Sequence, residues 1–212
     1  MFTRRDRTTR VHQQTYVRNG EIVTTSLIPA WPRRHQFTAE EFNWMAEVGL
    51  LDGESEVELI EGEIIHVSPM GTRDRQVVER LRAVLQSAVA GRAVVDIRRA
   101  MRLGNLTETQ PALVVRKPGR DPRSGFATGN DTLLVVEVSG TTALYDHDIK
   151  LPIYATHGIP EVWIVDLQSH QVYFYRSLVQ DRYTEVQICG NPGLTRITSY
   201  ADVDIDLSGL PI

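Results

Sequence analysis

Glu137 interrupts an otherwise apolar run, residues 133–138, of the kind that forms a buried strand. A carboxylate in such a strand is costly unless it pairs with a cation or binds a metal ion. Asp146, Lys150 and Tyr154 follow it at spacings of i, i+4 and i+8, which places all three on one face of a helix. Two interpretations stay open: an Asp146–Lys150 ion pair on the surface, or an active-site face directed at Glu137.

Lysine usage favours a functional role for Lys150. The chain contains 21 arginines but only two lysines, Lys117 and Lys150. In such a composition a simple charged position would drift to arginine. Lysine differs because its pKa falls readily on burial, so it can move a proton or orient a water molecule.

A second carboxylate of interest is Glu58, one of three acidic residues in the segment 57–63. Acids at this density on a hairpin usually mark a solvated face, so Glu58 is either a surface residue or a further site acid. The common motifs are absent: there is no glycine-rich phosphate loop, no G-x-S-x-G and no H-E-x-x-H. The six histidines lack metal-ligand spacing, and the single cysteine, Cys189, excludes an intrachain disulfide and a cysteine zinc site.

The elements that must position these residues follow from periodicity and from turn signals. Thr38 and Glu41 predict a capping box at the start of a helix that ends at Gly49, with Trp44 in the core. A second helix is expected at 72–90, and a third at 146–157. Strands are expected at 57–60 and 63–67 around Glu61-Gly62, and at 93–99, 112–115, 133–138, 162–166, 172–176 and 183–188. The pattern is typical of a mixed sheet flanked by helices, an α/β or α+β domain.

Composition and length describe an ordinary globular protein. Hydrophobic residues make up 42% and charged residues 24% of the 212 residues. No apolar run approaches the roughly 18 residues of a membrane-spanning helix, and no secretory signal follows Met1. We therefore expect no membrane association, and a cytoplasmic location fits.

The net charge of −4 conceals an asymmetry between an N-terminal arm, residues 1–36, and the domain expected at 37–212. The arm carries seven arginines against two acids, a net charge of +5, so the remainder carries −9. Residues flanking Asn19-Gly20 predict a small hairpin within the arm, and Pro29 and Pro32 predict a linker around Trp31. The arm is either a solvated tail or a surface for nucleic acid or for another copy of the chain.

Four segments together resemble the Uma-type putative restriction endonucleases of the PD-(D/E)XK nuclease superfamily. They are Glu-Leu-Ile-Glu-Gly-Glu-Ile at 58–64, Ser68-Pro69, Gln110-Pro111, and above all the segment 134–167. The last segment carries charged, glycine and aromatic positions in the family order. The resemblance covers residues 37–190 and leaves the arm outside.

This resemblance implies a restriction-endonuclease-like core, a mixed central sheet with helices on both sides. It also implies Mg²⁺-dependent hydrolysis of DNA, with Mn²⁺ as a substitute ion; RNA is an alternative substrate. Carried over to this sequence, Glu137 is the metal carboxylate, Lys150 orients water or stabilises the anionic transition state, and Glu58 is a helper acid. Asp146 and Tyr154 support them.

The family pattern has Pro-Asp where this chain has Pro111-Ala112, and alanine cannot bind a metal ion. Three explanations compete: a natural loss of chemistry, weak activity through a substitute acid, or deliberate inactivation of the protein. Glu108 and Asp131 are close to Ala112 in sequence, and Asp96 lies on the strand expected before it. Asp74 is a second departure from the family pattern, because the resemblance implies a histidine there, and this acid is a further candidate substitute. We therefore expect a metal-dependent endonuclease that is impaired as written.

The alternative function is a catalytically inactive nuclease-fold module that binds DNA or assembles with other copies. In that case the arm, residues 1–36, would join two chains into a homodimer or hold a partner. The sequence contains no readable base-recognition element, so the residues that contact nucleic acid are not predicted.

Overall fold

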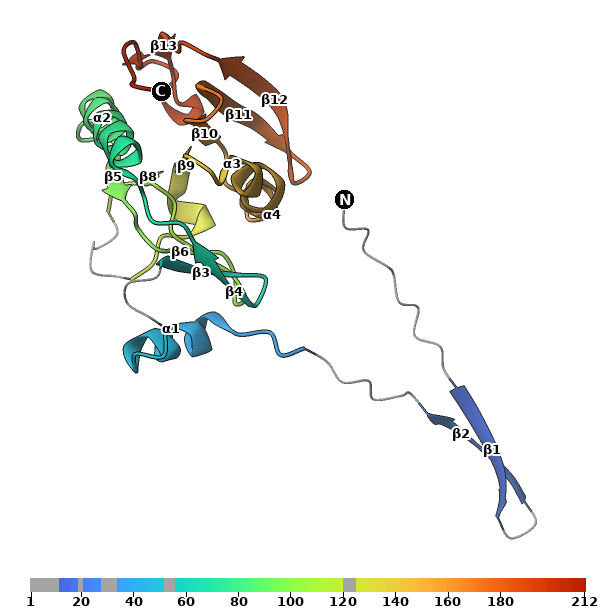
Figure 1. The fold of residues 1–212 in the computed structure, drawn as a ribbon. Coiled ribbons are helices and arrows are strands. Elements are labelled where there is room, and N and C mark those ends of the chain that lie inside the picture. Colours follow the sequence, from blue (N-terminus) through green and yellow to red (C-terminus); the bar gives the residue numbers. More distant parts are fainter. Residues whose placement is uncertain (1–11, 19–20, 28–33, 52–55, 120–124) are drawn as a thin grey trace. The chain divides into compact units, whose positions relative to one another are not determined.

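The computed structural model describes residues 12–18, 21–27, 34–51, 56–119 and 125–212. The chain divides into two compact units, Met1–His35 and Gln36–Ile212. All the helices and the central sheet belong to the second unit (Figure 1).

The first unit contains one antiparallel pair of strands. β1 (His12–Arg18) pairs with β2 (Glu21–Leu27) in a register that places Arg18 opposite Glu21. The two strands confirm the predicted hairpin. The turn Asn19-Gly20 and the proline segment around Trp31 lie outside the described residues.

In the second unit, α1 (Ala39–Glu47) begins with the predicted capping box. The Thr38 hydroxyl accepts from the Glu41 N–H, and the Glu41 carboxylate accepts from the Thr38 N–H at 2.8 Å. Phe42 lies in the core, but the prediction for Trp44 is wrong, because 57% of this residue is exposed. Two residues along a helix correspond to a rotation of about 200°, so Trp44 lies on the face opposite to Phe42.

A small four-stranded sheet has the order β4-β3-β7-β6. Its strands are β3 (Glu56–Ile60), β4 (Glu63–Val67), β6 (Met101–Arg102) and β7 (Glu108–Thr109). Glu61 and Gly62 connect β3 to β4 with φ angles of 49° and 84°, the positive values that a two-residue hairpin turn requires. The predicted pair of strands around this turn is confirmed.

The central sheet has six strands in the order β12-β11-β10-β9-β8-β5. Their bounds are β12 (Arg182–Cys189), β11 (Gln171–Val179), β10 (Val162–Asp166), β9 (Thr132–Ser139), β8 (Leu113–Arg116) and β5 (Val94–Ile97). β9 and β10 run parallel, and the other neighbours are antiparallel. The expected mixed sheet is thus confirmed, with strands centred where the apolar runs and the turn signals predicted them.

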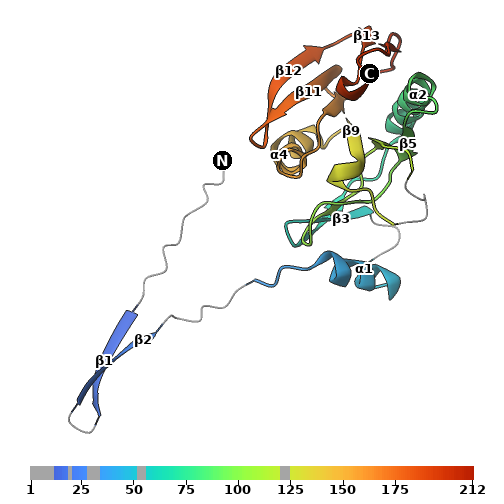
Figure 2. The same cartoon turned by 180° about the vertical axis from the view of Figure 1, so that it is seen from behind.

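The two faces of this sheet carry separate hydrophobic cores, and α2 and α4 lie on either side of β9 (Figures 1 and 2). α2 (Thr72–Ala88) packs on one face through Val77, Val78, Leu81 and Leu85, together with Val136 and Val138 of β9. Val135 belongs to the other core. Since side chains alternate along a strand, Glu137 shares the face of Val135.

The chain crosses from β9 to the parallel strand β10 over the face that Glu137 occupies. The crossover consists of α3 (Ala143–Tyr145), the π-helical turn η2 (Asp146–Lys150) and α4 (Leu151–Thr156). In the π turn the Leu151 N–H donates to the Asp146 carbonyl, five residues earlier. The prediction of one regular helix at 146–157 is wrong in this respect. Pro152 provides the reason, since proline has no N–H and its ring collides with the carbonyl four residues before it.

The remaining elements are short. They are η1 (Gly129–Asp131), η3 (Thr198–Tyr200), β13 (Leu194–Thr195) and β14 (Ile205–Asp206). The sequence did not predict β6, β7, β13 or β14, because two-residue strands arise from tertiary pairing and have no periodicity of their own. No helix in the described part of the chain is long and apolar enough to cross a membrane.

Candidate active site

Lys150 joins Glu137 and Glu58, three residues that come from η2, β9 and β3. The Lys150 Nζ atom lies 2.7 Å from Glu137 Oε1 and 3.0 Å from Glu58 Oε1. All three residues are buried, with 4%, 5% and 2% of their surface exposed respectively. The structure therefore brings together the three residues that the sequence analysis placed at the catalytic centre.

Asp146 completes the surroundings of the lysine. Its Oδ1 atom lies 3.8 Å from Lys150 Nζ, and its Oδ2 atom accepts a hydrogen bond from the Ser139 hydroxyl. Both members of the Asp146–Lys150 pair are buried, so the surface ion pair is excluded. The sequence analysis missed Ser139. Its position two residues after Glu137 places it on the same face of β9, and this alternation was the available signal.

Tyr154 contacts Glu137 from α4. Its hydroxyl donates to Glu137 Oε1, the same oxygen that faces Lys150. The Thr109 hydroxyl lies 3.5 Å from the Tyr154 hydroxyl. The tyrosine is fully buried. The spacing that predicted one face for Asp146, Lys150 and Tyr154 thus brings these side chains to one site, where Lys150 and Tyr154 contact Glu137 and Asp146 contacts Lys150.

Glu58 receives a second contact from the backbone that follows β7. The Gln110 N–H donates to Glu58 Oε1 at 2.7 Å. Glu58 Oε2 is buried and has no partner among the described residues. The solvated-face interpretation of Glu58 is wrong, because β3 pairs on both sides with β4 and β7 and is covered at this point.

The carboxylates keep the lysine charged. Burial opposes the ammonium form of Lys150, but Glu137, Tyr154, Glu58 and Asp146 outweigh it and hold the pKa of the lysine well above its ordinary value. Burial also raises the pKa of Glu137 from 4.5 to about 7, against the attraction of Lys150, and the nearby Asp146 and Glu58 add to the rise. Burial raises the pKa of Asp146 as well. The site therefore contains one cation, Lys150, which balances only part of the negative charge of three neighbouring carboxylates.

Ala112 occupies the bend that precedes β8. The pairing of Leu113 with Val136 places Ala112 opposite Glu137 when the register is continued by one residue. Ala112 is buried in the same hydrophobic core as Val138. The alanine is therefore next to the site along the backbone, with its methyl group packed among apolar side chains.

The acids that could replace an aspartate at position 112 are engaged elsewhere. Asp96 binds Arg116, Glu108 binds Asn43 and Arg102, Asp131 accepts from Thr128, and Asp74 accepts from the Gly71 N–H. Across the described ranges, no group of three histidine, cysteine, aspartate or glutamate side chains could hold a metal ion. Mg²⁺ is commonly bound through one or two carboxylates and keeps several waters in its octahedral shell, and Ala112 supplies no carboxylate beside Glu137.

Two comparisons with known proteins agree with this architecture. The sequence profile of the Uma2 family, described as a putative restriction endonuclease, matches residues 39–208. A crystal structure of a putative nuclease belonging to DUF820 from Anabaena variabilis superimposes with a TM-score of 0.62 at 19% sequence identity. The match covers 82% of this chain and 97% of that one. A search of curated proteins found no match. The predicted nuclease fold is confirmed.

Proposed function

The chain belongs to the Uma2 putative restriction endonuclease family, and on this premise we propose that it is a cytoplasmic nuclease-fold protein that acts on DNA, with hydrolysis impaired by Ala112. The observation that carries the proposal is the buried ammonium of Lys150 between Glu58 and Glu137. Lysine at this place supplies positive charge where a pentavalent phosphate would develop negative charge.

Each neighbour has a role that follows from its contact. Glu137 is the carboxylate that a metal ion would use, and Tyr154 and Lys150 fix the orientation of its Oε1 oxygen. Glu58 is the helper acid, and Asp146 holds Lys150 from the other side. A divalent ion supplies polarisation of the phosphate in this class of enzyme. This chain lacks one ligand for such an ion, the carboxylate expected at position 112.

A plasmid-cleavage assay tests the proposal. The protein and its Ala112→Asp variant are each incubated with Mg²⁺, Mn²⁺ or EDTA. We expect Ala112→Asp to cut at least about a hundredfold faster than the unchanged chain, with EDTA abolishing the difference. Ala112→Asp combined with Glu137→Gln, which removes the proposed metal carboxylate and keeps the Lys150 cation, is the inactive control.

The burial of Ala112 calls for a second control, because an aspartate there enters an apolar core. Thermal unfolding of Ala112→Asp shows whether the variant is folded, and Ala112→Ser reports the effect of a small polar residue without a carboxylate. If folded Ala112→Asp binds DNA and does not cut with either ion, the proposal of a nuclease lacking one ligand is wrong.

The charge asymmetry of the chain favours one alternative function, a DNA-binding or assembly module. The arm carries a net charge of +5, and the remainder of the chain carries −9. The hairpin of the arm is a two-stranded pair, and such a pair alone is only marginally stable in water. In this alternative, DNA binding without cleavage weakens steeply as salt rises. Removal of residues 1–36 should then abolish binding or convert a homodimer to a monomer. Unchanged binding and unchanged mass in light scattering exclude it.

A further inference from the structure

A strongly basic segment lies in the middle of an acidic domain. Residues 98–123 carry seven arginine and lysine residues against two acids, a net charge of +5, whereas residues 37–212 as a whole carry −9. Glu56, Asp96 and Asp131 are acids from outside the segment that contact its basic residues. When these three acids are included, the net charge is still +2. The segment is therefore a local excess of positive charge in a domain that is otherwise acidic.

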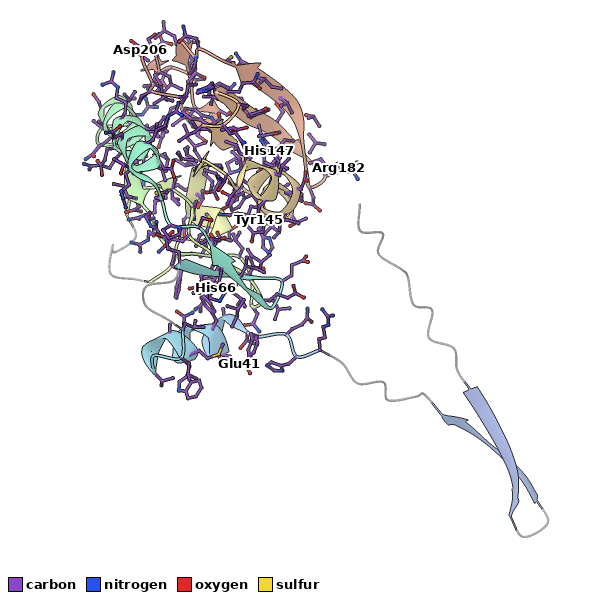
Figure 3. All side chains as sticks on the ribbon, in the orientation of Figure 1. Glu41, His66, Tyr145, His147, Arg182 and Asp206 are labelled. Atoms are coloured by element: carbon purple, nitrogen blue, oxygen red, sulfur yellow. The ribbon has the colours of Figure 1, made fainter. Side chains whose placement is uncertain are left out.

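The stretch 108–112 within this segment borders the candidate active site. It includes β7, and the small sheet of β7 and β4, which also carries His66, packs on the crossover beside Tyr145 (Figure 3). Gln110 is exposed, and its N–H donates to buried Glu58 at 2.7 Å. The buried site therefore comes within one residue of the surface at Gln110.

Arg98 is held beside this stretch by both its backbone and its side chain. Its N–H donates to the Ala112 carbonyl at 3.0 Å. Its guanidinium donates from Nη1 to Glu56 Oε1 at 2.8 Å and from Nη2 to Gln110 Oε1 at 2.6 Å. Its φ angle of 45° is uncommon for a residue other than glycine, and such conformations cluster at functional sites. The side chain is 29% exposed, and a guanidinium has five N–H groups, so it can still donate to a ligand from solvent.

Arg102 presents a second guanidinium near the same stretch. Glu108 Oε2 accepts from its Nε and Nη2 atoms, and its guanidinium carbon lies 4.1 Å from the centre of the Phe126 ring. The side chain is 32% exposed and lines a cavity of about 510 Å³ together with Asn130 and His157. The carboxylate and the ring fix the orientation of the guanidinium, and its Nη1 group remains available to a ligand.

The ligand that fits two such groups is a chain of phosphates. The planar fork of arginine matches phosphate oxygens, and contacts to phosphate supply most of the affinity of proteins for DNA. Arg98 and Arg102 lie on the two sides of a stretch that ends beside Ala112. A backbone bound to both arginines would therefore pass over the place where the site is closest to solvent.

We propose that Arg98 and Arg102 bind phosphates of the DNA backbone and hold one strand of a duplex across Gln110. The identity of the ligand rests on the proposed function, whereas the location of the surface rests on the contacts above. The two arginines bind substrate and take no part in bond breaking. The negative charge of the remaining domain repels DNA, so this surface decides the side from which the duplex approaches.

Equilibrium binding of the full chain to a fluorescent DNA duplex of about 20 base pairs tests the proposal, in EDTA and at about 50 to 200 mM KCl. Two double variants each remove one arginine and its carboxylate, Arg98→Met with Glu56→Gln and Arg102→Met with Glu108→Gln. The net charge stays constant, and neither carboxylate is left without its cation. Each variant should weaken binding about tenfold near 0.1 M salt and should lower the slope of log Kd against log salt by about 1.

Arg92→Met with Asp202→Asn is the matched control. Arg92 also pairs with an acid, at 2.7 Å from Asp202, and lies 4.4 Å from the centre of the Tyr200 ring, but it lies at the opposite end of β5 from Arg98. This control should change the Kd by less than about twofold. Thermal unfolding shows that each variant is folded, and the two arginines are tested separately, so one unstable variant leaves the other to decide.

Three results would overturn the proposal. The first is binding that is unchanged in the folded double variants, and the second is binding that is lost only when residues 1–36 are removed. The third is displacement of the duplex by free inorganic phosphate at constant ionic strength, because a single phosphate would then be the ligand.

Cleavage in the Ala112→Asp background separates this proposal from the proposed function. The double variants should raise KM about tenfold and leave kcat unchanged, since they remove binding that substrate and transition state share. If Ala112→Asp does not cut while the double variants lose DNA binding, the hydrolysis is wrong and the binding surface stands. If Ala112→Asp cuts and the double variants leave KM unchanged, the hydrolysis stands and the binding surface is wrong.

Discussion

Lys150 is the residue on which the candidate site depends, because its ammonium group is the only charge that opposes Glu58, Glu137 and Asp146 within 4.0 Å in the described structure. A buried ion pair is a weak source of net stability, but removal of one partner is strongly destabilising. The same lysine therefore carries the proposed chemistry and keeps three buried carboxylates compatible with the fold.

Lys150→Met should lower the free energy of unfolding by about 3 to 5 kcal/mol, since the carboxylates lose their cation. Lys117→Met is the matched control, because the other lysine is exposed and donates to the Asn130 carbonyl. It should change stability by less than about 0.5 kcal/mol. Urea unfolding at neutral pH measures both, and equal losses would show that Lys150 contributes no more than a surface lysine.

Glu137 should make stability depend on pH. Its pKa rises from 4.5 to about 7 on folding, so the folded chain holds the proton more tightly. The contribution of protonated Glu137 to the free energy of unfolding is complete below about pH 4.5. It is lost as pH rises through 7, a loss of about 3 kcal/mol. Glu137→Gln should remove this slope. Parallel pH profiles of unfolding for the two proteins would contradict the prediction.

The sequence predicted the members of the site better than their surroundings. Glu137 was identifiable because a carboxylate stood in an apolar strand, and Lys150 because lysine is scarce in this chain. The burial of Glu58 was not predictable from its acidic neighbours, since Lys150, its partner, lies 92 residues away. Local composition describes a hairpin, whereas long-range pairing decides which of its side chains is covered.

At the scale of the element, the π turn between α3 and α4 is the feature that aligns the site. It carries both Asp146 and Lys150, and π turns occur frequently at functional positions. Regular helical periodicity cannot predict such a turn, although Pro152 marked the place where α-helical geometry is interrupted. The inner strands of the central sheet, by contrast, were predictable from short apolar runs bounded by turn signals.

The contact between η1 and His157, the residue that follows α4, leaves no room for a side chain at Gly129. A Cβ atom there would lie 2.3 Å from the His157 carbonyl oxygen, which belongs to backbone and cannot rotate away. Gly129→Ala should therefore destabilise the chain by about 1 to 3 kcal/mol. Gly193→Ala is the control, because a Cβ atom there meets nothing within 4 Å. Urea midpoints that shift equally for both variants would refute this packing.

At the scale of the whole molecule, the three hydrophobic cores all lie within Gln36–Ile212. A chain that lacks Met1–His35 should therefore unfold cooperatively at the same temperature as the full chain in calorimetry. A lower midpoint that depends on protein concentration would show instead that the arm stabilises an assembly of copies.

The mutual dependence of Lys150 and its carboxylates affects how such proteins evolve. Selection for a folded chain alone conserves Glu58, Glu137 and Lys150, because each of them needs the others to be buried. Position 112 takes no part in these contacts, so an exchange of aspartate for alanine there would remove none of the contacts that join these three residues. On the proposed function, genome surveys that count nucleases by the Glu137–Lys150 signature would include lineages that no longer cut, and the residue at position 112 would be the better criterion.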